Sequence, residues 1–88
     1  MTFKFAGALL RLIGYRRLIQ VEAATVHEGV QALLKEFPGL EPILYDEKRQ
    51  IRSSHRFLLN GKPITQADFE RALEPTDCVQ VVTAIAGG

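Results

Sequence analysis

The residues whose types and spacing could support a reaction lie at the C-terminal end of the chain. The sequence closes Val-Thr-Ala-Ile-Ala-Gly-Gly, with Gly87 and Gly88 last. Glycine has no Cβ, so two of them fit a narrow channel and take backbone dihedrals closed to other residues. A terminal carboxylate, with a reference pKa of ~3.5, is ionised and unreactive at neutral pH. Conversion of Gly88 by ATP into an acyl-adenylate would open an unhindered carbonyl to sulfide, a persulfide, a thiol or an amine.

The position of the two glycines strengthens this interpretation. A Gly-Gly ending arises by chance in about half a percent of chains when glycine is ~7% of residues. Here the glycines follow directly from a predicted strand, so a rigid body would project them. Residues 83–88 span at most ~20 Å when extended, enough to thread a tunnel into a partner's active site. We therefore predict a domain over residues 1–83 and a flexible tail over residues 84–88.

Other reactive side chains do not combine into a site. His27 and His55 lie in different predicted elements, without cysteine or carboxylate partners at the spacing of a metal site. Cys78 has no evident base to activate its thiol, so we interpret it as a small packing residue at the start of a strand. We therefore predict no metal site and no catalytic group besides the C-terminal carboxylate.

Composition and charge narrow the class of protein. The chain has 88 residues, of which 47% are hydrophobic, so it is one domain with enough apolar residues for a core. Its net charge of +1 does not indicate nucleic acid or an anionic membrane as a partner. No stretch approaches the ~18 apolar residues of a membrane span, and the single cysteine fits a reducing compartment. We expect a cytoplasmic protein.

A basic cluster near the start of the chain allows two interpretations. Arg11, Arg16 and Arg17 lie close together in the sequence. They could dock an acidic partner. The simpler interpretation is a solvated face of a hairpin, because short charge clusters are usually exposed to water.

The elements that must position the C-terminal end begin with two strands. Residues 2–5 alternate polar and apolar side chains, with Phe3 and Phe5 on one face, and residues 18–21 alternate in the same way. Because residues i and i+2 of a strand share a face, both runs predict half-buried strands paired as a hairpin. The long connection between them contains a predicted helical turn.

A helix follows the hairpin. Thr25 and Glu28 have the spacing of a capping box, which marks the start of a helix. The apolar positions behind the cap repeat at helical spacing: Val26, Val30, Leu33, Leu34 and Phe37. Pro38-Gly39 ends the pattern, since proline cannot continue a helix and glycine suits a left-handed stop.

The second half of the chain predicts three more strands. A polar loop over residues 46–54 leads into a strand, an Asn60-Gly61 turn and a short return strand. Thr65 with Asp68 caps a brief helix, and a last strand carries Val79 and Val81 inward. The order predicts an α+β fold of the β-grasp, or ubiquitin-like, type: a mixed sheet of four to five strands with one main helix. Its first and last strands would be a parallel central pair.

The end of the chain resembles the small sulfur carriers of the ThiS/MoaD type. These end on an apolar residue, an Asp-x-Val step and a short apolar tail with Gly-Gly, here Leu73, Asp77, Val79 and residues 84–88. The stretch "FLLNGKPI" is also similar, and "FPGLEPILYDEKRQIR" is similar to a longer connection in some members. The chain differs from the family pattern at two places that could alter how partner enzymes fit. Val82-Thr83 occupy the position where many members have proline, and Cys78 replaces a common acidic residue.

The resemblance implies a carrier and not an enzyme. An adenylating enzyme of the ubiquitin-activating type would use ATP on Gly88, and a sulfur donor or sulfurtransferase would convert it to a thiocarboxylate. A biosynthetic enzyme, of a cofactor, cysteine or siderophore pathway, would accept the sulfur while Gly87 and Ala86 line its channel. The resemblance implies no bound cofactor in the carrier.

Strand parity predicts where such partners dock. With Phe3, Phe5, Val79 and Val81 inward, the outer sheet face carries Lys4, Leu58, Gln80 and Val82. We expect Leu58, Val82 and Ile85 to form a small exposed apolar patch that leads to the tail.

Two other functions use the same features. A ubiquitin-like modifier would have the same fold, activation step and glycines, but its Gly88 would be joined to lysine amines of target proteins. A structural β-grasp domain of a larger assembly would carry Gly-Gly incidentally. The residues do not identify the pathway that receives the sulfur.

Overall fold

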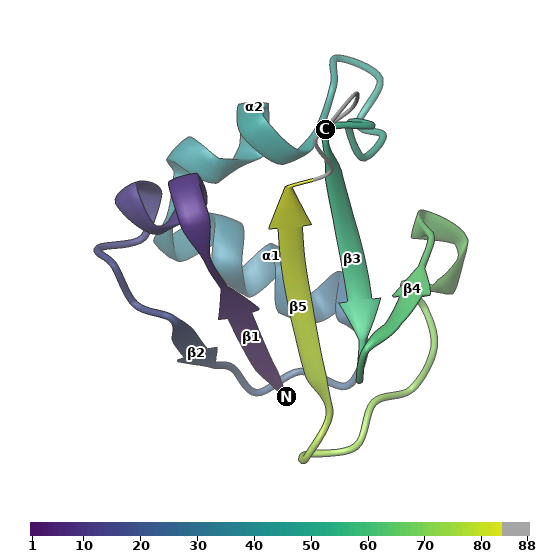
Figure 1. The fold of residues 1–88 in the computed structure, drawn as a ribbon. Coiled ribbons are helices and arrows are strands. Elements are labelled where there is room, and N and C mark those ends of the chain that lie inside the picture. Colours follow the sequence, from purple (N-terminus) through teal and green to yellow (C-terminus); the bar gives the residue numbers. More distant parts are fainter. Residues whose placement is uncertain (84–88) are drawn as a thin grey trace.

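A five-stranded mixed sheet wraps around one long helix in the computed structural model, which describes residues 1–83 (Figure 1). The strand order is β2-β1-β5-β3-β4. The strands are β1 (Thr2–Phe5), β2 (Leu18–Gln20), β3 (His55–Leu59), β4 (Lys62–Ile64) and β5 (Cys78–Thr83). The α-helices are α1 (Val26–Glu36) and α2 (Glu41–Leu44), and the 3-10 helices are η1 (Gly7–Leu12), η2 (Pro38–Leu40) and η3 (Gln66–Asp68). This is the β-grasp arrangement that the sequence predicts.

The centre of the sheet is a parallel pair, as predicted. Strand β5 runs parallel to β1, with Phe3 opposite Val79 and Phe5 opposite Val81. The other strand pairs are antiparallel. Because β5 has β1 on one side and β3 on the other, it is bonded along both edges.

Helix α1 covers the inner face of the sheet (Figure 1). The Thr25 hydroxyl oxygen accepts the Glu28 N–H at 3.1 Å, as the capping box predicts, whereas the Glu28 carboxylate accepts the N–H of Ala24 at 2.9 Å, one residue before the cap. The helix ends before Pro38. Gly39 continues into η2 without the left-handed conformation that the sequence suggested. The helix therefore ends at its C-cap Phe37, whose φ is −127°, just before a proline that could not continue it.

The core lies between the sheet and the helices. Both inward phenylalanines of β1 and both inward valines of β5 are buried, as predicted from parity. Gly29 lies where α1 crosses β1, and an added Cβ there would stand 3.1 Å from the Met1 sulfur. Within residues 1–83 the buried hydrophobic residues of the core are Met1, Phe3, Phe5, Leu9, Leu10, Ile13, Ile19, Val26, Val30, Leu33, Leu40, Leu44, Phe57, Phe69, Val79 and Val81.

The polar loop between α2 and β3 is folded by its own hydrogen bonds. The Asp46 carboxylate oxygen Oδ1 accepts the backbone N–H of Lys48 at 2.8 Å and that of Gln50 at 3.0 Å. A β-bridge between Tyr45 and Ile51 closes the base of the loop. An Asp side chain that bonds the backbone two residues on is a common way to order a turn.

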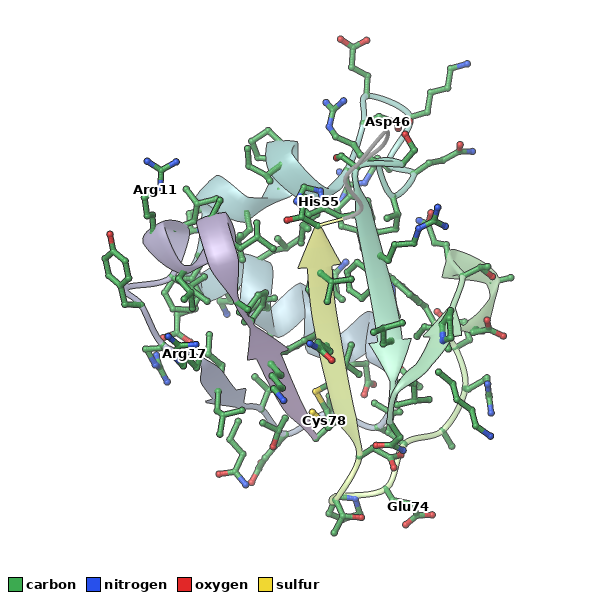
Figure 2. The ribbon with its side chains drawn as sticks, viewed as in Figure 1. Arg11, Arg17, Asp46, His55, Glu74 and Cys78 are labelled. Carbon is green, nitrogen blue, oxygen red and sulfur yellow. The ribbon has the colours of Figure 1, made fainter. Side chains whose placement is uncertain are left out.

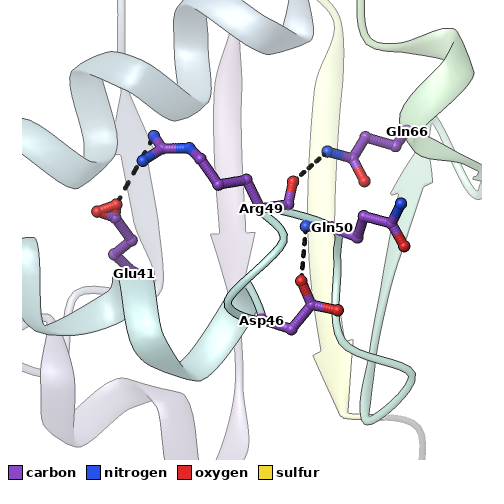
Figure 3. Close-up of polar contacts among 5 residues, drawn as sticks. All are labelled: Glu41, Asp46, Arg49, Gln50 and Gln66. Carbon is purple, nitrogen blue, oxygen red and sulfur yellow. Dashed lines mark hydrogen bonds and ion pairs between the residues drawn. The ribbon is translucent and has the colours of Figure 1, made fainter.

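The side chain of Gln66 fastens this loop to η3 (Figure 3). Its Nε2 donates to the Arg49 carbonyl oxygen at 2.9 Å, and its Oε1 accepts the Ile51 N–H at 3.0 Å. The amide thus pairs with the loop backbone as a neighbouring strand would. The Arg49 guanidinium lies 3.9 Å from the Glu41 carboxylate, an exposed ion pair that contributes little.

Candidate functional site

The strand that leads into the C-terminal segment is held firmly on both sides. Strand β5 pairs with β1 up to Val81, and it pairs with β3 until Thr83, which lies opposite His55. The predicted site residues Ile85, Ala86, Gly87 and Gly88 lie outside the described residues. The structure therefore fixes where the segment starts, at the β3 side of the sheet centre.

The beginning of β5 is fixed by a polar cluster. The Asn60 side chain donates from Nδ2 to Asp77 Oδ1 at 2.9 Å, while its Oδ1 accepts the N–H of Cys78 at 2.9 Å. Asp77 Oδ2 also accepts the N–H of Glu74 at 2.8 Å. The two hydrogen bonds to the Asp77 carboxylate hold its pKa below the ordinary value. The bond from Asn60 has the larger effect and the bond from the Glu74 N–H the smaller. The cluster joins the β3–β4 turn to the start of β5.

The turn that supplies Asn60 has the backbone that the sequence predicts. Asn60 has φ 51° and Gly61 has φ 85°, both in the left-handed region. Such an Asn-Gly pair suits a two-residue hairpin turn whose twist matches the strands. The sequence predicts the turn, but it does not reveal that the Asn60 side chain bonds Asp77 at the start of β5. The two residues are 17 positions apart in the chain.

The outer face of the sheet carries the predicted docking residues. A single row of paired residues crosses all five strands in the order Leu18, Lys4, Gln80, Leu58 and Pro63. Val82 lies on the same face, two residues beyond Gln80. Leu58 and Val82 are both partly exposed, so their apolar surface is open to a partner. The register thus places them on one face, as parity predicts.

Two residues beside the end of β5 were not recognised as neighbours from the sequence. Arg56 is exposed and lies opposite Val82, and His55 lies opposite Thr83. Ser54 Oγ is 2.9 Å from His55 Nδ1, and partial burial lowers the pKa of the imidazole below its ordinary value. Only the strand register, which the sequence does not reveal, brings these side chains beside β5.

The other reactive side chains do not form a site of their own. Within residues 1–83, no group of three His, Cys, Asp or Glu side chains could hold a metal ion. His27 is exposed in the first turn of α1, and Cys78 is half-buried at the start of β5. Figure 2 shows Cys78 and His55 at opposite ends of the sheet.

One cavity among residues 1–83 lies away from the end of β5. It has a volume of about 600 Å³ and opens beside the start of β1. It is lined by Met1, Gln20, Val21, Glu22, Ala23, Leu73 and Pro75. A lone carboxylate among apolar and amide groups has neither a nucleophile nor an acid–base partner, so this hollow offers no reaction centre.

No helix within residues 1–83 has the length and apolar character to cross a membrane.

Comparisons with known proteins identify the fold. No family model matches the chain, and no curated protein matches it closely enough to count as a relative. Among solved structures, SAMP1 from Haloferax volcanii has a TM-score of 0.82 at 22% identity, over 99% of this chain and 97% of that one. The Amycolatopsis orientalis BexX/CysO complex gives 0.82 at 19% identity, over 99% and 98%. The complex of molybdopterin-converting factor subunits 1 and 2 from Helicobacter pylori gives 0.64 at 20% identity, over 99% and 96%. The chain therefore has the ubiquitin-like β-grasp fold.

Proposed function

We propose that the chain is a sulfur carrier whose Gly88 is adenylated, converted to a thiocarboxylate and used as a sulfur donor in a biosynthetic pathway. The observation that carries the proposal is the position of β5. It is the central strand, it is bonded along both edges, and only four residues lie between its end at Thr83 and Gly88. A fixed strand followed by a short glycine-ended segment can deliver a carboxylate to another protein's active site.

The chemistry needs no catalytic group in the carrier. The Gly88 carboxylate attacks the α-phosphate of ATP, which releases pyrophosphate and forms an acyl-adenylate. Hydrosulfide then attacks the glycyl carbonyl, the bond to the phosphate oxygen breaks, and AMP leaves with the bonding pair. The product is a thiocarboxylate that can give its sulfur to an acceptor. ATP would bind to the adenylating enzyme, so the carrier itself would need no bound cofactor.

The outer sheet face is the proposed docking surface for the adenylating and sulfur-accepting enzymes. Leu58 and Val82 expose apolar surface there, and Arg56 stands beside Val82. In the sequence Ile85 follows three residues after Val82, and we propose that it extends this apolar surface while Ala86 and Gly87 line the partner's channel. An apolar centre beside a cation suits a partner with an apolar patch and an acidic rim.

The comparisons support a role that involves other proteins. Two similar structures are protein–protein complexes, one of BexX with CysO and one of two subunits of molybdopterin-converting factor. The sequence resemblance to ThiS/MoaD carriers leads to the same class. ATP and a reducing environment for the thiocarboxylate both suit the cytoplasm.

A second candidate is a ubiquitin-like modifier joined through Gly88 to lysines of target proteins. One similar structure is named small archaeal modifier protein 1, and this observation favours it. The activation step would be identical. A lysine amine, in place of hydrosulfide, would attack the acyl-adenylate and release AMP.

Intact mass after co-expression separates the two functions. The chain is produced with the adenylating enzyme and sulfurtransferase of its own genome, next to a variant that lacks Gly88. A mass gain equal to one oxygen-to-sulfur exchange, in the full chain alone, is the expected result. Ladders of larger lysine-linked adducts would favour the modifier. An unchanged mass with a competent enzyme would contradict both.

A further inference from the structure

We propose that the outer edge of β2 binds an acidic, extended segment of a partner protein as a sixth strand of the sheet. The surface, called here the β2 edge surface, consists of Arg11, Leu12, Tyr15, Arg16, Arg17 and Leu18. It lies at the far edge of the sheet from β4, with β1 between it and β5. A strand bound at this edge would therefore lie beside Leu58 and Val82 and not over them.

Exposed apolar side chains gather on this short segment. Among the described residues, four large apolar side chains are exposed, and three are here: Leu12 at 40%, Tyr15 at 68% and Leu18 at 61%. Single exposed apolar residues are ordinary, but three within seven positions concentrate exposed apolar surface on one short segment. Tyr15 also has φ 63°, an unusual conformation for a bulky residue, in the turn just before β2.

The backbone of β2 has an open edge. Met1 and Val21 exchange both backbone hydrogen bonds, and Phe5 donates to the Arg17 carbonyl oxygen at 2.9 Å. Because bonded pairs alternate along an antiparallel ladder, the N–H and C=O groups of Leu18 and Gln20 point away from β1. These groups are the ones that an added strand would bond.

The charge of the surface selects an acidic segment. Arg11 and Arg17 project on the β2 side of the molecule (Figure 2). The Arg16 guanidinium lies 3.1 Å from the Glu36 carboxylate of α1, with both side chains about half exposed. No ion pair within residues 1–83 involves Arg11 or Arg17. Carboxylates flanking an apolar strand would complement these two guanidinium groups.

The same charges disfavour a second copy of this chain. Charged residues beside a short edge strand, here Arg16 and Arg17, are a common guard against self-pairing. Such a guard rejects like charge and admits opposite charge. The net charge of +1 and the exposed leucines also fit a protein strand better than nucleic acid.

A titration followed by amide NMR tests the proposal with the full chain. The probe is a blocked peptide that alternates valine with aspartate or glutamate, and its control carries lysine at the acidic positions. The expected result is shifts at residues 11–20 and slowed hydrogen exchange of the Leu18 and Gln20 amides. The Ile19 amide, already bonded to β1, should keep its exchange rate. The lysine peptide should cause neither effect.

Matched variants define the recognition. Arg17→Glu should weaken binding of the acidic peptide by about fivefold, the effect of one exposed charge pair, and R11E with R17E should weaken it further. Lys48→Glu makes the same charge change in the 45–54 loop and should leave binding unchanged.

Several results would overturn the proposal. They are no shift at millimolar peptide, equal binding of the lysine peptide, or shifts centred on Leu58 and Val82. Protection of Leu18 by self-association without peptide would assign the edge to a second copy. Binding of a single-stranded oligonucleotide at Arg11 and Arg17, with the acidic peptide inert, would assign it to nucleic acid.

Discussion

The two faces of β5 each carry a valine, but one valine packs in the core and the other is partly exposed. Val81 points inward and is fully buried, whereas its neighbour Val82 points outward and is partly exposed. Both are β-branched residues suited to a strand. The inner valine holds the central strand in the core, and the outer one is free to contact a partner. Paired substitutions at these adjacent positions therefore separate folding from recognition.

The largest effect is expected on the inner face. Val81→Asp places a carboxylate in the core between α1 and the sheet, where none of the residues 1–83 is a buried polar or charged residue that could pair with it. The free energy of unfolding should fall by about 4 kcal/mol or more, because burying an unpaired charge is among the costliest substitutions. Denaturant unfolding measures it. A folded Val81→Asp protein of nearly normal stability would show that the assigned parity is wrong.

The next effect tests how β5 is held at its start. Asn60→Gly keeps a residue that tolerates the left-handed turn but removes the amide that bonds Asp77. The Asp77 pKa should rise toward its ordinary value, which carboxyl-carbon NMR measures directly.

Stability should follow the same titration. A carboxyl whose pKa is depressed in the folded state stabilises above its unfolded pKa, and this contribution disappears as pH falls through the folded pKa. The stability gap between the normal chain and Asn60→Gly should therefore narrow in acid. A gap independent of pH would mean that the bond from Asn60 does not set the Asp77 pKa.

On the outer face a charge should affect binding and hardly affect folding. Val82→Asp should change the free energy of unfolding by about 0.5 kcal/mol or less, as for most surface substitutions. Affinity for the adenylating enzyme should fall about tenfold or more if Val82 lies at the centre of the interface. Ala67→Asp adds the same charge on η3 and serves as the control. Normal enzyme affinity of Val82→Asp would remove this face from the docking surface.

The smallest effect concerns His55 at the end of β5. Burial lowers the pKa of this imidazole, so the folded chain binds its proton less readily than the unfolded chain. The resulting stability is present above the unfolded pKa and decreases as pH falls toward the folded one. His55→Asn should flatten the stability profile in this mildly acidic window. An unchanged profile would assign the pH dependence to other groups.

Much of the fold is readable from local patterns. The alternation around Phe3 and Phe5, the cap at Thr25 and the Asn60-Gly61 turn each depend on neighbours in the chain, and the structure confirms them. Two details differ from the sequence prediction: the Glu28 carboxylate accepts the N–H of Ala24 and not that of the cap residue, and Gly39 has no left-handed conformation. Both lie at helix ends, where the backbone conformation depends on the path of the neighbouring chain.

Long-range contacts account for what the sequence did not show. The Gln66 side chain orders a loop more than ten residues away, and the Asn60 amide reaches Asp77 across the sheet. The pairing of Arg56 with Val82 depends on a strand register that no single segment encodes. The roles of Gly87 and Gly88 remain a prediction from sequence, since they lie outside the described residues.

The most direct test of the central claim is pyrophosphate exchange at the C-terminus. The adenylating enzyme is incubated with ATP, labelled pyrophosphate and either the full chain or the variant lacking Gly88, with unfolding curves to confirm equal stability. Adenylation at Gly88 predicts label in ATP with the full chain and none with the variant. Equal exchange with both chains, or none with the full chain and a competent enzyme, would contradict it.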